Sequence, residues 1–183
     1  PEAVNELITP RTRVIIVNSP SNPTGTVQTR KEIKALAEIA DDNDITIISD
    51  EVYEHFIYEG EHVSPAQFTD KVITINAVSK TYAMTGWRIG YAAARKEYVE
   101  QMLKVHQYIQ ACANSIAQKA AQAAIEGPQD CVKQMRDSFR NRRDIVMEGL
   151  GAMGIKCIKP EGAFYAFPEV SDDDAPQKLL AKG

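Results

Sequence analysis

The sequence predicts an α/β fold with a mostly parallel sheet. Residues 13–18 and 44–50 are short runs rich in Val and Ile that end in polar, turn-forming residues, which is typical of buried strands. Between these two runs, apolar residues recur at helical spacing, namely Ile33, Leu36, Ala37 and Ala40. The order strand, helix, strand is a crossover unit, and crossover units build parallel sheets.

Further elements follow from capping and from hydrophobic runs. Thr29 with Glu32 three positions later has the pattern of a capping box, which predicts a helix over residues 30–41. Residues 71–79 predict a third strand, and residues 87–94 a fourth.

The second half of the chain has a mainly helical pattern. Residues 96–126 are rich in Ala, with a break predicted near 111–115. The first part of this segment offers an apolar face made by Val99, Met102, Leu103, Val105 and Ile109. A long amphipathic helix is predicted over residues 128–150, and residues 154–170 predict two strands around a Pro-Glu-Gly turn. We place a domain boundary at the start of the long helix.

Composition excludes several classes of protein. The 183 residues are 44% hydrophobic and 25% charged, with a formal net charge of -4, as in ordinary globular proteins. Lys and Arg are scattered, so a nucleic-acid surface has no support, and no apolar run reaches the roughly 18 residues of a membrane span. Cys112, Cys131 and Cys157 are not in metal-ligand spacing, which predicts reduced thiols, no metal site and a cytoplasmic location. Because the chain lacks an initiator Met, we expect a fragment.

Polar residues follow three of the predicted strands. Asn22 lies in the loop after the first, Asp50 and Tyr53 follow the second, and Lys80 follows the third. Because the carboxyl ends of parallel strands meet at one edge of a sheet, these four residues are expected to converge into a site.

Each of these residues also has a simpler interpretation. Asp50 could cap a helix, and "IISDE" resembles the second acidic motif of a nucleotide hydrolase, although the chain has no G-x-x-x-x-G-K-[ST] loop. Lys80 could be a solvent-exposed charge, and Tyr53 could pack with Phe56 and Tyr58. The acidic run 171–174 is interpreted as a solvated turn. His55, His62 and His106 are interpreted as surface or packing residues. Four aromatic residues are interpreted as packing residues: Trp87, Tyr91, Tyr165 and Phe167.

Several segments together resemble one family. "NSPSNPTG", "SDEVY" and "SKTYAMTGWRIGY", in this order, resemble the signature segments of the class I aminotransferases, pyridoxal-phosphate enzymes of the aspartate aminotransferase fold. "PEGAFYAFPEV" is similar to a segment of that family's small domain. The resemblance implies the C-terminal portion of the large cofactor-binding domain in residues 1–127. It also implies the linking helix and the beginning of a smaller α+β domain in residues 128–183, and a homodimer in the full-length protein.

The resemblance assigns roles to individual residues. It implies that Lys80 is the catalytic residue, which holds pyridoxal 5'-phosphate as a Schiff base and then moves the substrate's α proton. Asp50 would pair with the pyridine nitrogen, and Tyr53 and Asn22 would hydrogen-bond the phenolic oxygen. Asn22 would also contact the substrate carboxylate, and its bond to Pro23 would be cis.

The phosphate and the reaction follow from the same resemblance. Ser79 and Arg88 would bind the phosphate, while Ala77 stands where many relatives have Ser or Gly, so one phosphate contact is absent. The implied activity is transfer of an amino group between an amino acid and a 2-oxo acid. Further cofactor-binding and carboxylate-binding residues are expected outside this chain, so the chain alone should be inactive. The alternatives are a carbon-sulfur lyase or synthase of the same fold, and a non-catalytic sensor domain.

Overall fold

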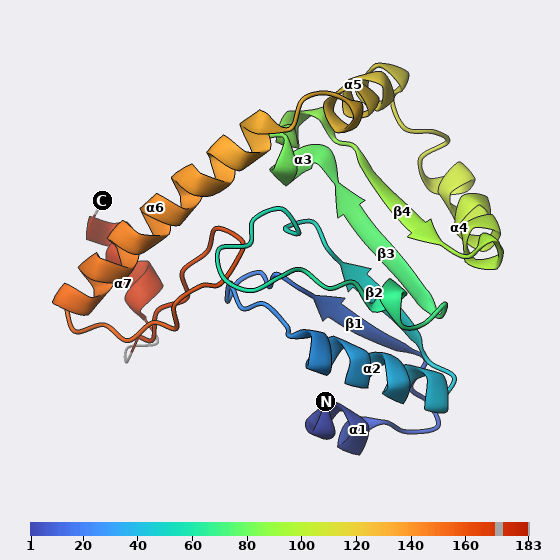
Figure 1. Cartoon of the computed structure of the whole chain (residues 1–183), viewed down its shortest axis with the longest axis horizontal. Helices are drawn as coiled ribbons and strands as arrows, with labels where there is room; N and C mark the ends of the chain where they lie inside the picture. The colour runs from blue at the N-terminus through green and yellow to red at the C-terminus, as the bar shows by residue number, and fades with distance from the viewer. Residues whose placement is uncertain (171–173, 183) are drawn as a thin grey trace.

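Four strands form a single mixed sheet in the computed structural model, which describes residues 1–170 and 174–182 (Figure 1). The strands are β1 (Val14–Asn18), β2 (Thr46–Asp50), β3 (Val72–Ala77) and β4 (Gly90–Ala94), and they lie in that order across the sheet. The first three are parallel, and β4 is antiparallel to β3. The predicted α/β fold is therefore confirmed.

Helix α2 (Arg30–Asp42) makes the crossover between β1 and β2 and covers one face of the sheet. The predicted capping box is present, since the N–H of Glu32 donates to Thr29 Oγ1 and the N–H of Thr29 donates to Glu32 Oε2. The buried face of the helix joins strand residues in one hydrophobic core, which includes Ile33, Leu36, Ala37, Ala40, Val17, Ile47 and Val72.

Three helices of the second half follow the predicted order, namely α4 (Lys96–Ile109), α5 (Ser115–Glu126) and α6 (Asp130–Ala152). The predicted break at 111–115 is confirmed, because it separates α4 from α5. The long helix α6 leads away from the neighbourhood of α3 (Val78–Thr81) toward α7 (Ala175–Lys182) (Figure 1). The structure also has α1 (Glu2–Leu7), η1 (Pro65–Gln67) and η2 (Thr85–Trp87), which, like α3 and α7, the sequence did not predict.

Three predicted elements differ from the structure. The third strand ends at Ala77 because the chain turns into α3, and the fourth begins only at Gly90, after the 3-10 turn η2. The two strands predicted in residues 154–170 are wrong, since this segment makes only isolated bridges, between Ile57 and Gly162 and between Cys157 and Pro168. Proline has no N–H to donate, so Pro160 and Pro168 interrupt any regular ladder there. The acidic run 171–174 lies mostly outside the described residues.

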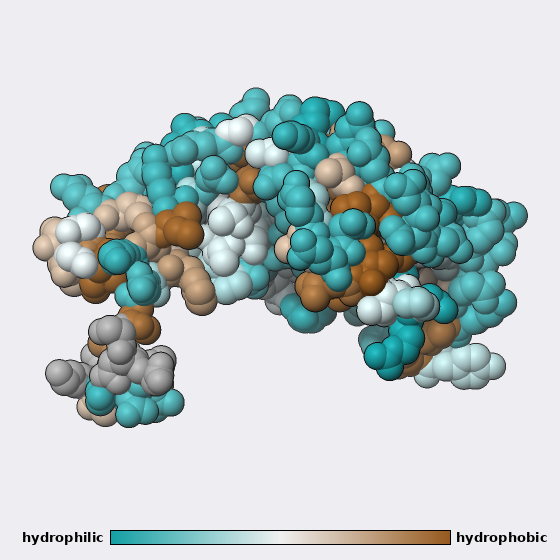
Figure 2. All heavy atoms as spheres, turned by 90° about the horizontal axis from the view of Figure 1, so that it is seen from below, coloured by the Kyte–Doolittle hydropathy of each residue, from teal (hydrophilic) through white to brown (hydrophobic). Residues whose placement is uncertain are grey.

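Much apolar surface stays exposed in the part of the chain that the structure describes. The predicted apolar face of α4 is formed, yet the helix buries no residue, and Ile109 is 76% exposed. On the sheet face opposite α2, Ile16 is 74% exposed. Figure 2 accordingly shows brown apolar areas on the surface of the face seen from below. Among the described residues, no helix is both long and apolar enough to cross a membrane.

Candidate functional site

The carboxyl ends of β1 and β2 lie side by side, as the sequence predicts. Asn18 pairs with Asp50 in the parallel register, and the Asn18 side-chain amide donates to the Asp50 carbonyl oxygen over 3.2 Å. One carboxylate oxygen of Asp50 accepts from the N–H of Val52 at 3.3 Å. That bond fixes the Asp50 side chain at the point where the chain leaves the sheet.

Asn22 is held by the same strand end. Its N–H donates to Asn18 Oδ1 over 2.6 Å, so Asn18 links the loop that carries Asn22 with the end of β2. The Asn22–Pro23 bond is cis, as the resemblance implies, and the Ser19–Pro20 bond is cis as well. The side chain of Asn22 is exposed.

Lys80 and Tyr53 come together although they follow different strands. Lys80 lies in α3, directly after β3, and its Nζ is 6.0 Å from the centre of the Tyr53 ring and 5.6 Å from that of Phe164. Across residues 1–170 and 174–182, the Lys80 amine makes no hydrogen bond and no ion pair. The simpler interpretation, an exposed lysine in solvent, is wrong, because Lys80 is half-buried against two aromatic rings.

The hydroxyl of Tyr53 meets the hydroxyl of Tyr165. Burial, the hydrogen bond with Tyr165 and the nearby negative charge of Asp50 raise the pKa of the Tyr53 phenol above its usual range. Tyr53 therefore remains a neutral phenol that can donate a hydrogen bond at any physiological pH. Tyr165 was predicted to be a packing residue. The alternating pattern of residues 164–167 did not indicate this hydrogen bond. The hydroxyl itself was the available signal, because a buried tyrosine hydroxyl usually has a hydrogen-bond partner.

Ser79 and Arg88 lie on either side of the 3-10 turn η2. Ser79 is half-buried in α3 beside Lys80, whereas Arg88 is exposed and adopts a left-handed backbone conformation with φ 53°. The Arg88 guanidinium donates to the Thr85 carbonyl at 2.9 Å, and no carboxylate among the described residues pairs with it. An open hollow of about 920 Å³ lies beside it. Trp87 and Tyr91, predicted to pack, are each 47% exposed, so that prediction is wrong within the described chain.

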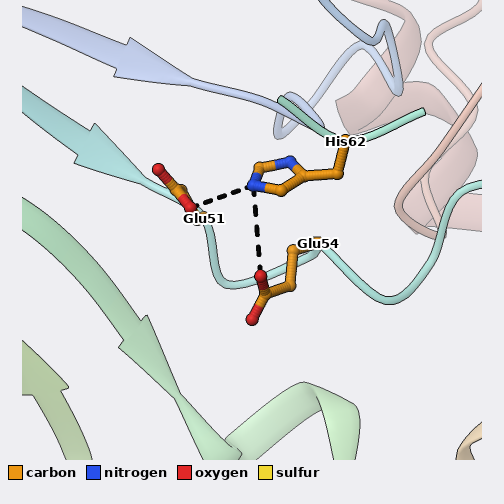
Figure 3. A group of neighbouring side chains, drawn as sticks. All are labelled: Glu51, Glu54 and His62. Carbon is orange, nitrogen blue, oxygen red and sulfur yellow. Dashed lines mark hydrogen bonds and ion pairs between the residues drawn. The ribbon is translucent and has the colours of Figure 1, made fainter. Parts of the chain in front are cut away.

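A cluster of Glu51, Glu54 and His62 lies just past the end of β2 (Figure 3). The imidazole Nε2 of His62 lies 2.9 Å from Glu51 and 4.0 Å from Glu54, and Ser64 Oγ donates to Glu51 over 2.6 Å. Burial alone raises the pKa of Glu51, but the hydrogen bonds from His62 and Ser64 outweigh it and hold that pKa below its usual value. The cluster therefore ties residues 61–64 back to the strand that positions Asp50. The sequence prediction of an ordinary surface or packing histidine missed this partnership.

The unpaired groups suit a ligand of mixed charge. Lys80 offers a free amine, Asp50 a carboxylate without an ion pair, and Arg88 a cation without an ion pair, all within the described residues. A lysine amine is the group that binds an aldehyde covalently, a carboxylate suits a protonated ring nitrogen, and a guanidinium suits a phosphate. This donor set fits pyridoxal phosphate.

Comparisons with known proteins agree with this chemistry. The model of the family described as "Aminotransferase class I and II" matches residues 1–182. The chain is 52% identical over 177 residues to a probable aspartate aminotransferase of Methanocaldococcus jannaschii, covering 93% of this chain and 47% of that protein. It is 43% identical over 192 residues to the aspartate/prephenate aminotransferase of Thermus thermophilus, covering 100% of this chain and 50% of that protein.

Solved structures are similar over the whole described fold. A mutant aspartate aminotransferase of Thermus thermophilus complexed with tryptophan superposes with a TM-score of 0.96 at 41% identity, covering 100% of this chain and 50% of that one. The aromatic aminotransferase of Pyrococcus horikoshii superposes with a TM-score of 0.93 at 39% identity, covering 99% and 51%. This chain spans about half the length of the relatives that it matches. The chain belongs to the family of class I and II aminotransferases.

Proposed function

We propose that the full-length protein is an aminotransferase that moves an amino group between an amino acid and a 2-oxo acid. The observation that carries this proposal is the Lys80 amine, which is unpaired among the described residues and lies against Tyr53 at the strand edge that also holds Asp50. The names of the relatives make aspartate and aromatic amino acids the first donors to test.

The cofactor is pyridoxal phosphate, which, when bound, supplies an electron sink for the charge at the α carbon of the amino acid. Lys80 binds it covalently and, once released, takes the substrate's α proton and returns it. An arginine could not take this role, because its guanidinium stays protonated.

Other residues of the chain hold the cofactor and the substrate. Asp50 keeps the ring nitrogen protonated, because its negative charge favours the cationic form. Asn22 and Tyr53 donate hydrogen bonds to the phenolic oxygen, and Asn22 also contacts the substrate carboxylate. Ser79 and Arg88 bind the phosphate, Arg88 with two parallel N–H bonds.

The whole protein is proposed to be a cytoplasmic homodimer. Residues 1–127 belong to its large domain, and residues 128–183 contain the linking helix and the beginning of its small domain. The exposed apolar residues of α4 and of the open sheet face support further chain or subunit contacts in the complete protein, because large exposed apolar areas are uncommon on isolated proteins.

The test uses the full-length protein with added pyridoxal phosphate. Wild type should gain a visible absorbance band from cofactor attached to Lys80, and Lys80→Ala should lack it. Lys104→Ala is the matched control, because Lys104 is an exposed lysine of α4. An unchanged band in Lys80→Ala would contradict the proposal.

A second measurement identifies the reaction. An aminotransferase forms the 2-oxo acid of the donor only when an amino-group acceptor is present, whereas a lyase releases ammonia without one. Ammonia release with no acceptor would therefore replace the aminotransferase assignment with the lyase alternative.

A further inference from the structure

The segment 160–165 is fastened to two loops at the candidate site. The N–H groups of Glu161 and Gly162 both donate to the carbonyl of Gly25 at 2.9 Å, and the N–H of Ala163 donates to the carbonyl of Phe56 at 2.9 Å. Gly25 and Gly162 allow this close approach. A Cβ on Gly25 would lie 2.5 Å from Pro160 Cβ, and one on Gly162 would lie 2.8 Å from the Phe56 carbonyl oxygen. The position of Tyr165 is thus set by the loops after β1 and β2.

The aromatic rings of this segment enclose Tyr53. The Tyr53 ring packs edge-on against Phe164 at 5.2 Å and against Tyr165 at 5.5 Å between ring centres. Phe164 in turn stacks on Phe139 of α6 at 4.9 Å. These contacts hold the hydroxyls of Tyr53 and Tyr165 in a part-buried hydrogen bond with each other.

The number of O–H groups determines the direction of this hydrogen bond when the cofactor is bound. A phenol has one O–H to donate, and its oxygen can also accept. According to the proposed function, Tyr53 uses its O–H to donate a hydrogen bond to the cofactor's phenolic oxygen. The hydrogen bond between the two tyrosines then requires Tyr165 as the donor and Tyr53 as the acceptor.

We infer that Tyr165 is a positioning residue, whose hydroxyl donates to Tyr53 and thereby directs and strengthens the bond from Tyr53 to the cofactor's phenolic oxygen. This inference rests on the proposed function. Hydrogen bonds in a chain polarise one another, so a phenol that accepts a bond becomes a better donor. Tyr165 therefore acts on the cofactor through Tyr53 and without touching it.

The consequence is a defined change in proton affinity. A hydrogen bond to the phenolic oxygen withdraws negative charge, which otherwise helps to hold the proton on the neighbouring imine nitrogen. Removing the Tyr165 hydroxyl weakens that bond, so the imine proton is held more tightly and titrates at higher pH. A replacement that makes residue 165 a stronger donor has the opposite effect.

The experiment is a spectral pH titration of the Lys80-dependent band in the full-length protein. Tyr165→Phe should raise the midpoint by about half a unit to one unit, as expected for the loss of one hydrogen bond. Tyr53→Phe should raise it further. In the Tyr53→Phe background, Tyr165→Phe should add nothing, because the residue through which Tyr165 acts is gone.

Two tyrosines serve as controls. Tyr58→Phe removes the hydroxyl that donates to the carbonyl of Ala163 in the same segment, so it should lower the melting temperature with no change of the midpoint. Tyr108→Phe, at a residue that is 93% exposed, should change neither. These controls separate a loss of packing from the effect on the cofactor.

The outcomes are distinct from those that test the function itself. A Lys80-dependent band whose midpoint is unchanged in Tyr165→Phe, or an equal shift in the Tyr53→Phe background, overturns the inference and leaves the proposed function intact. Absence of the band from wild type contradicts the proposed function and, with it, the inference. If Tyr165→Phe does not fold, 3-fluorotyrosine at position 165 keeps the shape and hydroxyl, and a midpoint that fails to fall overturns the inference.

Discussion

The imidazole Nε2 of His62 lies 2.9 Å from the carboxylate of Glu51, whose residue is 4% exposed. The N–H of Glu51 continues the pairing of β2 with β3 by donating to the Ile75 carbonyl at 2.9 Å. Since successive side chains of a strand point to opposite faces, Glu51 and Asp50 lie on different faces of the sheet end. The pair with His62 thus holds the strand end from the face opposite Asp50.

Replacing Glu51 with Gln should make the free energy of unfolding less dependent on pH in the acid range. Folding lowers the pKa of Glu51 from its ordinary value of 4.5, so its contribution to stability is present above that pH and is lost as the pH falls through the lower, folded value. Glu51→Gln should lower the free energy of unfolding at pH 7 by about 1 to 3 kcal/mol, because a buried charged hydrogen bond is weakened.

Denaturant unfolding of the full-length protein at pH 7 and at several acid pH values checks this prediction. Glu6→Gln is the control, since Glu6 is exposed. The free energy of unfolding of Glu51→Gln should lie below that of wild type at pH 7 and approach it at low pH. Glu6→Gln should match wild type at every pH. If Glu51→Gln lost as much stability in acid as wild type does, another group would be responsible for the acid sensitivity.

Gly162→Ala should loosen the segment that carries Tyr165. The new Cβ would lie 2.8 Å from the Phe56 carbonyl oxygen and 2.9 Å from two ring atoms of Pro20, so the backbone must shift. Overpacking of this kind costs about 1 to 3 kcal/mol of unfolding free energy. Thermal unfolding is the measurement.

Gly149→Ala provides the opposite expectation for the same chemical change. A Cβ at Gly149 meets nothing within 4 Å inside α6, so alanine should stabilise that helix by up to about 1 kcal/mol. Equal melting temperatures for the two variants would argue against a close approach at Gly162.

Local patterns predicted the sheet and the helices well. Val and Ile runs indicated β1 to β3, and the residues Thr29 and Glu32 indicated the start of α2, because these signals act over a few positions. The meeting of Lys80 with Tyr53 also followed from the topology of parallel strands, without any contact being known.

Contacts between distant segments could not be predicted in this way. The segment 154–170 alternates like a strand, yet residues 161–163 bond to Gly25 and Phe56, more than 100 positions earlier. The partners of Tyr165 and His62 are likewise set by where loops meet in space. The apolar face of α4 was correctly located, but its spacing cannot tell whether the residues that cover it belong to this chain.

Thr29→Ala should destabilise α2 at its first turn. The Thr29 hydroxyl accepts from the N–H of Glu32, and loss of an N-terminal cap costs about 1 kcal/mol. Chemical denaturation should show this loss, while Lys31→Ala, an exposed change in the same turn, should be nearly neutral. Because alanine itself favours the helix, a decrease of similar size for Lys31→Ala would mean that truncation of any side chain in this turn, and not loss of the cap, determines the result.

Asp50→Asn should separate the charge of this residue from its structural role. Asparagine keeps an oxygen that can accept from the N–H of Val52, so the strand end should stay folded. The negative charge proposed to face the ring nitrogen is lost, and that nitrogen no longer remains protonated. Because electrostatic stabilisation by one positioned group is worth on the order of 10²- to 10³-fold in rate, kcat/KM for transamination should fall by about that factor.

Steady-state kinetics of the full-length Asp50→Asn protein, with its Lys80-dependent absorbance band recorded in parallel, checks both halves of this expectation. The band should persist, since Lys80 is unchanged, while kcat/KM falls. Asp70→Asn, at an exposed residue before β3, should retain wild-type kinetics. If Asp50→Asn kept kcat/KM within twofold of wild type, the carboxylate at this strand end would not be the partner of the ring nitrogen, and its role would be confined to holding the N–H of Val52.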